Sequence, residues 1–445
     1  MKKYQVIMPI ALPVALAVSV VYMVKQRTET NYQYQSYMQA AADYEKNGIV
    51  EDAIASYQAA LQIQPSLDGY LAIGTIYMNE QNYYEAETWY RDELAVNYPD
   101  DSRTYAFGIQ AMMAQGNARE AFSIYDTAQE RNLVDDSLRE LMQPIWYSFD
   151  LVGDYTAVTG FSNTAGLAAV RYTDNWGYVD TEGGRVVDYL YSQAGTFGEV
   201  APVVDETGEA YFIDTAGNKK ITASYFLEKD PEFGQIQQFL PVQSGLVAAY
   251  NGQIWNYYDA STYEKRFGGY AQATQITNGV GGVSQDGKKW ALISQDGQLL
   301  TDFVYDEVVT DDKGVPCRTQ ALIVRQDGGY RLVDRAGQPV GSTVYEDACA
   351  FYDNNLAAVK KDGRWIFVSE TGEETDLGDF EQVKSFAAGA APAKQNGKWG
   401  YIDQEGTWII EPQFEDAGTF NSSGVAFVQT EEEKWELLKL FRFHH

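Results

Sequence analysis

Carboxylates are the most abundant side chains here that could do chemistry, and many of them stand in short turns. The chain has 445 residues, with 63 Asp and Glu against 33 Lys and Arg and a net charge of −30. Copies of Asp-x-x-Gly recur, as in Asp180-Thr181-Glu182-Gly183. A calcium loop needs oxygen ligands at alternating positions and a later bidentate Glu, but this turn supplies only two carboxylates. We therefore expect no metal site, with Asp capping its own turn and Gly accepting a positive φ.

The other residue types that carry catalysis are scarce. Histidine occurs only as His444 and His445, which argues against a His base, a Ser-His pair or a His-ligated zinc. Cys317 and Cys349 have no His to activate either thiol. An oxidising compartment would allow a disulfide between them, but two cysteines do not establish one. Because no phosphate-cradling or dinucleotide-binding glycine motif is present either, we expect no catalytic residue, no cofactor and no enzyme.

The acidic excess also bears on partners. A surface this negative repels nucleic acid and anionic lipid, so we expect no nucleic-acid partner. Its simplest role is to keep a long exposed domain soluble.

A Trp signature recurs through the last two thirds of the chain and decides the architecture. Aligned on the residue four places after the Trp, the copies number eight, near 35 residues apart with two longer steps of 45 and 40. Within each copy, small or β-branched residues alternate before a tight turn, which predicts a hairpin. Recurrence at one structural position favours packing between sheets over sugar stacking for these Trp residues. Six copies have Trp at the signature position, and the other two have Ala210 and Tyr330 there. The signature positions are Trp176, Trp255, Trp290, Trp365, Trp399 and Trp435, with turn residues Asp180, Asp214, Asp334 and Asp403.

The two ends of the repeat region complement each other. An aromatic residue followed six places later by Phe closes each unit, as in Phe414 and Phe420. One such pair, Tyr155 and Phe161, precedes the first Trp unit, while the eighth unit lacks its own pair. Joining the first and last sheets would remove free edges. We therefore predict an all-β, propeller-like ring of about eight units, with an open β-solenoid as the alternative.

At this point a family resemblance can be recognised. Residues 155–440 resemble the WG-repeat family of bacterial proteins, whose unit carries Gly-x-Trp-Gly-Tyr/Phe-Ile-Asp-x-x-Gly. Residues 397–406 match every position and residues 175–183 nearly every one. Other copies lose the Gly after Trp, as in Trp290-Ala291, so their assignment depends on spacing. The resemblance implies β-repeats over residues 154–443 and little about activity.

The front of the chain has a different character. Residues 6–24 contain no charge and are bracketed by Lys2 and Lys3 on one side and by Lys25 and Arg27 on the other. This length is just enough to cross a bilayer core as a helix.

A cleaved signal peptide is the competing interpretation, since Ala15-Leu16-Ala17 resembles a processing site. Cleavage there would leave an apolar stretch at the new terminus, so we expect an uncleaved anchor over residues 1–27. The positive-inside rule then predicts a single-pass protein of the cell membrane with its C-terminal body extracellular.

Residues 31–150 are helical in pattern, rich in Ala, Gln, Glu and Tyr at spacings of three and four. Three blocks follow one another, and they look like the tetratricopeptide repeat, a helix pair of about 34 residues. In that repeat, small residues let the helices approach and aromatics fill the groove between pairs. Glu93 replaces one expected Ala, and residues 136–147 would form a capping helix. The signature positions are Ala53, Gly74, Tyr77, Ala86 and Ala121.

These features predict a multidomain chain with a transmembrane helix, an all-α tetratricopeptide solenoid and an all-β repeat domain. We expect a non-catalytic, membrane-anchored scaffold that binds protein or peptide partners through the helical groove and the β-repeat face. The alternative is a cell-envelope protein that recognises carbohydrate with its β-repeats. Exposure of the in-register Trp side chains would favour the alternative.

Overall fold

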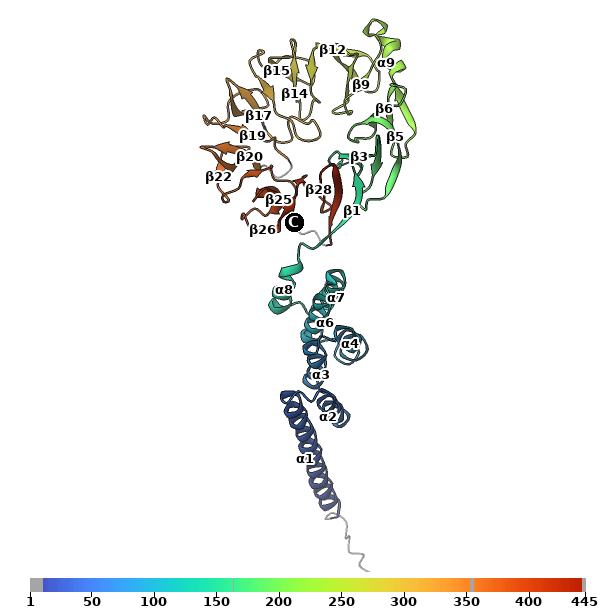
Figure 1. Ribbon diagram of the computed structural model, residues 1–445, viewed down its shortest axis with the longest axis vertical. Helices are drawn as coiled ribbons and strands as arrows, with labels where there is room; N and C mark the ends of the chain where they lie inside the picture. Colours follow the sequence, from blue (N-terminus) through green and yellow to red (C-terminus); the bar gives the residue numbers. More distant parts are fainter. Residues whose placement is uncertain (1–10, 163, 353–355, 442–445) are drawn as a thin grey trace, which may run out of the picture. The chain divides into compact units, whose positions relative to one another are not determined.

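The computed structural model of the chain describes residues 11–162, 164–352 and 356–441. Within these residues the chain divides into two compact parts, with the boundary between Ser148 and Phe149. The first part consists of helices, and we call it the helical part. The second is a ring of antiparallel sheets, which we call the β-ring (Figure 1).

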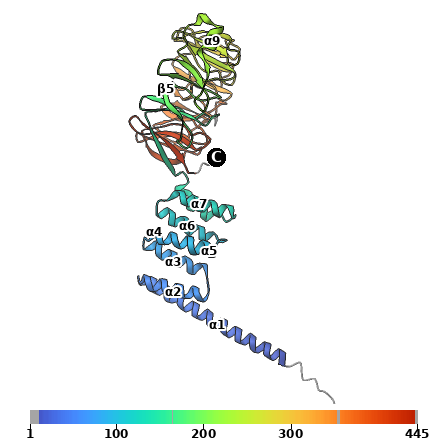
Figure 2. The same ribbon diagram turned by 90° about the vertical axis from the view of Figure 1, so that its right-hand side faces the viewer.

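Helices of the helical part follow one another through short loops and pack as neighbours (Figure 2). Side-chain caps fix several helix starts: the Ser66 hydroxyl accepts the N–H of Gly69, and the Asp135 carboxylate accepts that of Leu138. The helices and helical turns are α1 (Ala11–Lys46), α2 (Val50–Ile63), α3 (Leu67–Asn79), α4 (Tyr83–Trp89), η1 (Tyr90–Leu94), α5 (Ala95–Asn97), α6 (Ser102–Ala114), α7 (Ala118–Glu130), α8 (Asp136–Met142) and η2 (Gln143–Ile145).

Two glycines let neighbouring helices approach closely. A methyl group on Gly74 of α3 would lie 2.6 Å from the ring of Phe107 in α6. A methyl group on Gly108 of α6 would lie 2.6 Å from the ring of Tyr90 in η1. Each aromatic ring therefore occupies the notch that a glycine leaves, and the spacing between helices depends on it.

The π-helical turn η1 absorbs one extra residue. Ala86 and Pro99 are one residue further apart in sequence than Ala53 and Pro65, and a π-turn accommodates such an insertion inside a helix. It places Leu94 in the fully buried position and leaves Glu93 partly exposed. Glu93, which departs from the predicted pattern, thus lies beside the core, because the π-turn shifts the helix register by one residue.

The prediction of a membrane-spanning helix over residues 6–24, within the segment 1–27, was wrong. Among the residues that the structure describes, no helix is both long and apolar enough to cross a bilayer. Residues 6–10 lie outside that range. From Ala11 the apolar sequence of α1 ends at Val24, before Lys25, and this stretch is shorter than the roughly 20 residues a spanning helix needs. The prediction of a single-pass membrane protein with an extracellular body depended on this helix and was wrong for the same reason.

Eight repeats of short antiparallel strands form the described part of the β-ring (Figure 1). We number them repeat 1 (β2–β5), 2 (β6–β8), 3 (β9–β12), 4 (β13–β15), 5 (β16–β18), 6 (β19–β22), 7 (β23–β26) and 8 (β27–β29 with β1). Strand β5 pairs with both β4 and β6, so repeats 1 and 2 share one seven-stranded sheet.

The strands of repeats 1 to 4 are β2 (Ala157–Val158), β3 (Ala168–Tyr172), β4 (Asn175–Val179), β5 (Arg185–Ala194), β6 (Ala201–Asp205), β7 (Ala210–Ile213), β8 (Lys219–Thr222), β9 (Gln238–Phe239), β10 (Leu246–Tyr250), β11 (Trp255–Asp259), β12 (Lys265–Tyr270), β13 (Gln272–Ala273), β14 (Val280–Ser284) and β15 (Trp290–Ser294). Those of repeats 5 to 8 are β16 (Glu307–Val308), β17 (Ala321–Gln326), β18 (Gly329–Asp334), β19 (Asp347–Ala348), β20 (Leu356–Lys361), β21 (Arg364–Ser369), β22 (Glu374–Thr375), β23 (Gln382–Val383), β24 (Ala391–Gln395), β25 (Lys398–Ile402), β26 (Trp408–Phe414), β27 (Asp416–Ala417), β28 (Val425–Glu431), β29 (Lys434–Leu440) and β1 (Phe149–Tyr155).

The ring is closed by a strand that precedes repeat 1 in sequence. Strand β1 pairs antiparallel with β29 of repeat 8, with Phe149 opposite Leu440. Phe161 of the next segment stacks on Phe427 of β28 with ring centroids 5.2 Å apart. The leading fragment therefore completes the last repeat, as the complementary ends predicted, and the first and last sheets share one hydrophobic cluster.

The two long steps in the repeat spacing correspond to two insertions. The first contains α9 (Ala223–Lys229) and the 3-10 turn η3 (Pro231–Phe233), between β8 and β9. The second is a loop between β16 and β17, residues 309–320.

A buried tyrosine two places after the signature Trp ties a strand to an inner loop. The hydroxyl of Tyr178 donates to the carbonyl of Gly195 at 2.8 Å, and that of Tyr401 donates to Gly418 at 2.8 Å. The hydroxyl of Tyr257 makes the same bond, at the same sequence separation, to the carbonyl of Thr274. Burial raises the pKa of Tyr178 and Tyr401, so both hydroxyls stay protonated and donate.

We predict that Gly74→Ala destabilises the helical part by about 1–3 kcal/mol, because the added methyl overlaps the ring of Phe107. Helix propensity alone would give the opposite sign, since Ala is favoured over Gly by about 1 kcal/mol. Adding Phe107→Leu should restore part of the loss by making room for the methyl. Thermal unfolding followed by far-ultraviolet circular dichroism measures both, and a stabilised single variant would contradict the packing argument.

We predict that Val152→Pro opens the ring, because Val152 lies opposite Leu437 in the β1–β29 ladder and the proline ring fixes φ at about −65°, away from the extended values of a strand. The uncovered edge of β29 should lower the melting temperature and promote self-association, which light scattering would detect. Val152→Thr keeps a β-branched residue and is the control. An unchanged, monodisperse Val152→Pro protein would show that closure does not depend on β1.

Candidate binding site at the centre of the β-ring

The Asp-x-x-Gly turns are closed by their own Asp side chains. One carboxylate oxygen of Asp403 accepts the N–H groups of Glu405 (3.0 Å) and Thr407 (2.8 Å), and Gly406 has a φ of 82°. The equivalent pairs of bonds are made by Asp180, Asp214 and Asp334.

The carboxylates of these Asp residues accept hydrogen bonds from backbone N–H groups of their own turns. Bonds from the N–H of Asn218 and from Lys220 hold the pKa of Asp214 well below its usual range. Among the described residues, no three His, Cys, Asp or Glu side chains converge as metal ligands. The turns therefore explain the repeated Asp without a bound ion.

The six signature Trp side chains pack against the sheets. Trp365 and Trp399 are 6% and 4% exposed. The Nζ of Lys384 lies 4.9 Å from the ring centroid of Trp399. The partly buried members of the set contact the hydrophobic clusters between sheets: Trp176, Trp255, Trp290 and Trp435. In these positions they do not form a row of exposed stacking platforms.

The insertion at residues 309–320, which we call the crossing loop, is shaped by a buried ion pair. The Asp311 side chain is 0% exposed; it accepts the N–H groups of Lys313 (2.9 Å) and Val315 (3.0 Å) and pairs with Arg318 at 2.5 Å. Burial raises the pKa of Asp311, and the guanidinium of Arg318 opposes that rise.

This loop reaches from repeat 5 to the opposite side of the ring. The amide of Gln275 in repeat 4 donates to the carbonyl of Lys313 at 2.7 Å. A methyl group on Gly160, beside β2 of repeat 1, would lie 2.6 Å from Cε of Lys313 and 2.7 Å from the carboxylate of Asp312. The loop therefore lies against the backbone of repeat 1, where a side chain at position 160 would obstruct it.

The crossing loop divides the centre into two hollows. The first, hollow A, has a volume of 340 Å³ and is lined by the inner loops of repeats 1 to 4 and by the crossing loop. The second, hollow B, has a volume of 240 Å³ and is lined by repeats 1, 6, 7 and 8 and by Asp312. Because the inner loops of several repeats contribute to each hollow, both hollows lie towards the centre of the ring.

The linings of the two hollows differ. Hollow B contains acidic and basic groups, including Lys384 and Asp416. Hollow A is lined mainly by hydroxyl and amide side chains: Ser162, Thr164, Thr196, Gln243, Ser244, Gln275, Thr277 and Asn278, with Lys313 and Arg318 as its charged residues.

Both cysteines are free thiols in the β-ring. Cys317 is buried and lines hollow A, and Cys349 is half-buried beside repeat 7. Burial raises the pKa of both thiols to about 11, so they remain protonated at neutral pH and are poor nucleophiles.

In the helical part, the predicted signature residues lie at helix contacts. Tyr77 packs edge-on against Trp89 at 6.2 Å. The small residues of the set are all buried: Ala53, Gly74, Ala86 and Ala121.

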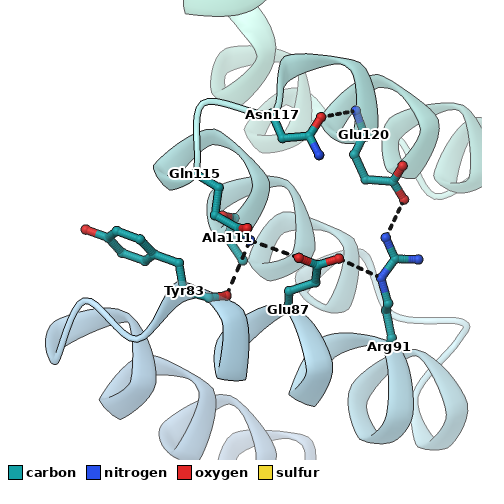
Figure 3. A network of polar contacts seen from close by, with 7 residues as sticks. All are labelled: Tyr83, Glu87, Arg91, Ala111, Gln115, Asn117 and Glu120. Carbon is teal, nitrogen blue, oxygen red and sulfur yellow. Dashed lines mark hydrogen bonds and ion pairs between the residues drawn. The ribbon is translucent and has the colours of Figure 1, made fainter.

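Polar contacts join the later helix pairs (Figure 3). Arg91 pairs with Glu87 at 3.0 Å and with Glu120 at 2.8 Å, and the amide of Gln115 bonds Glu87 at 3.1 Å. Exposed pairs of this kind contribute about 0–1 kcal/mol each, so they add little to the stability of the helical part.

Sequence reasoning missed the central hollows. Their lining residues come from loops in different repeats and share no motif. The available signal was the 40-residue step between Ser294 and Asp334, which indicated an insertion without showing where it points.

Eight antiparallel sheet repeats closed by pairing of the first and last strands define a β-propeller-like repeat protein. Residues 330–365, 378–399 and 399–435 match the family described as WG containing repeat. The predicted resemblance is thereby confirmed for these residues, which run from β18 of repeat 5 to the start of β29 in repeat 8.

No curated protein sequence matches the chain. Among solved structures, BamB from Moraxella catarrhalis is similar with 11% identity, covering 67% of this chain and 99% of its own, at a TM-score of 0.41. A eukaryotic initiation factor is similar with 11% identity, 66% and 88% coverage and a TM-score of 0.42. The WD40 β-propeller domain of Doa1 has 11% identity, 66% and 97% coverage and a TM-score of 0.35.

We predict that Arg318→Ala costs about 3–5 kcal/mol at neutral pH, because it leaves the Asp311 carboxylate buried without its partner. Losing Arg318 raises the pKa of Asp311 further. The folded state then binds a proton more readily than the unfolded state, so the loss should shrink as the pH falls through that raised pKa. Chemical unfolding followed by Trp fluorescence, at neutral and mildly acidic pH, measures the difference.

Arg364→Ala is the matched control, since this exposed Arg pairs with Asp376 at 2.9 Å and Asp379 at 2.7 Å on the surface. It should cost about 0–1 kcal/mol at either pH. Equal losses for the two variants would contradict the role given to the buried pair.

Proposed function

We propose that the chain is a non-catalytic binding protein that holds protein or peptide partners, with the helical part as its peptide-binding module. The helical part resembles a tetratricopeptide stack. In such stacks the first helices of successive pairs line a concave groove, and extended peptides bind along it.

One observation carries this proposal: successive helix pairs repeat the same small-residue contact. Ala53, Ala86 and Ala121 are each 0% exposed and stand 33 and 35 residues apart. The pairs are α1 with α2, α3 with the α4–α5 segment, and α6 with α7, and α8 packs on α6. Three pairs and a final helix supply the minimum that a stable stack of this kind needs.

The β-ring would act as a second interaction face. The carboxylates of its recurring Asp-x-x-Gly turns accept backbone N–H groups, and burial raises the pKa of its thiols to about 11, which supports binding rather than catalysis. The net charge of −30 would speed association with basic partners and slow it with acidic ones. Carbohydrate binding through the signature Trp residues finds less support, because Trp365 and Trp399 are buried.

A pair of threonines tests the groove. Thr75 on α3, a first helix, and Thr127 on α7, a second helix, are both exposed and both donate to a carbonyl four residues earlier, at 2.8 and 2.9 Å. We predict that peptides selected from a random displayed library on the full chain bind Thr75→Arg at least about tenfold more weakly, since the new side chain fills the groove. Thr127→Arg should bind as the unchanged protein does.

Fluorescence anisotropy with labelled peptides measures these affinities. Failure to select any saturable peptide would contradict the proposal. Equal weakening by both substitutions would place the binding surface elsewhere.

A further inference from the structure

We propose that hollow A of the β-ring binds a neutral sugar, a small ligand whose hydroxyl groups both donate and accept hydrogen bonds. This goes beyond the proposed function, which concerns macromolecular partners of the helical part. The volume of 340 Å³ lies within the range of small-molecule sites, about 300–1,000 Å³.

Unused hydrogen-bonding groups face this hollow from three repeats. The side chains of Thr164 in repeat 1, Thr196 in repeat 2 and Gln243 and Ser244 in repeat 3 line it. None of these four side chains forms a hydrogen bond with another described residue. Hydroxyl and amide groups on several walls of one cavity match a ligand that presents hydroxyls in several directions.

The opposite wall is held in place by the crossing loop. Gln275 is 4% exposed and donates through its amide nitrogen to the carbonyl of Lys313, while its amide oxygen has no partner among the described residues. The hydroxyl of Thr277 donates to the carbonyl of Cys317 at 2.8 Å. Because that oxygen is itself buried, Gln275 fixes the position of this wall and does not contact the ligand through it.

Charge distinguishes a neutral ligand from an ion. No Asp or Glu is among the described residues that line hollow A, so a metal cation has no carboxylate ligand there. Arg318 is neutralised by Asp311, and the carboxylate of Asp312 lies beside Lys313 in the same loop. The ion pair with Asp311 reduces what an anion would gain from Arg318, and the predominantly polar wall does not suit an apolar ligand.

A matched pair of threonines makes the test specific. Thr196 and Thr419 both lie half-buried between a Gly and a Phe at the same place in the repeat, in Gly195-Thr196-Phe197 and in its counterpart at 418–420. Thr196 lines hollow A, whereas Thr419 lines hollow B. The substitution to Val removes one hydroxyl from either side of the crossing loop with the same change in volume.

The experiment titrates the full chain with glucose, N-acetylglucosamine, maltose, cellobiose and chitobiose, and separately with inorganic phosphate, using ligand-observed NMR and calorimetry. We expect at least one sugar to bind saturably, about tenfold more weakly to Thr196→Val and unchanged to Thr419→Val. Absence of binding by every sugar, binding of phosphate alone, or equal loss in both variants would overturn the proposal. Thr75→Arg should leave sugar binding intact, so failure of this site and failure of the peptide groove are distinguishable.

Discussion

Pairing of β1 with β29 is the contact on which the rest of the β-ring depends. It completes the last repeat with a strand from the start of the ring, so that the first and last repeats are joined and the edge of β29 is covered. Closure also gives the inner loops a common centre. Gly160 of repeat 1 meets Lys313 of repeat 5 only because the two repeats face each other across a complete ring, so the central site exists as a consequence of the edge-to-edge pairing.

Within each repeat, a few polar bonds place the loops that surround this centre. The outer turns are capped by Asp side chains such as Asp403, and the inner loops are tied by buried tyrosines such as Tyr401. Both devices satisfy backbone groups that the short strands leave without ladder partners. The repeat can therefore vary its loop sequences, because the bonds that position those loops come from a small number of recurring residues.

The sequence predicted the features that local patterns encode and missed those that depend on chain register or distant contacts. Trp spacing and the Tyr155–Phe161 fragment indicated eight repeats and their closure, because each repeat uses the same residue types at the same positions to pack against its neighbours. The hollows escaped prediction, since residues such as Thr196 and Gln275 meet only after the ring forms. Glu93 departed from the expected Ala because the repeat pattern assumes an unbroken α-helix, whereas the π-turn η1 shifts the register by one residue. An apolar count suggested a spanning helix that the described residues do not contain.

The placement of β1 has a consequence for how the protein is made. Synthesis runs from the amino end, so β1 is finished before any repeat, yet its partner β29 is the last strand of the ring to be completed. Until β29 is made, β1 has no strand to pair with, and its apolar side chains have no partner to pack against. Closure is thus a late step between two strands that are far apart in sequence, and contacts of this kind form slowly. During translation the unpaired edge of β1 stays exposed and can associate with other chains. Short strands and charged turns throughout the intervening repeats would limit the association of such half-finished chains.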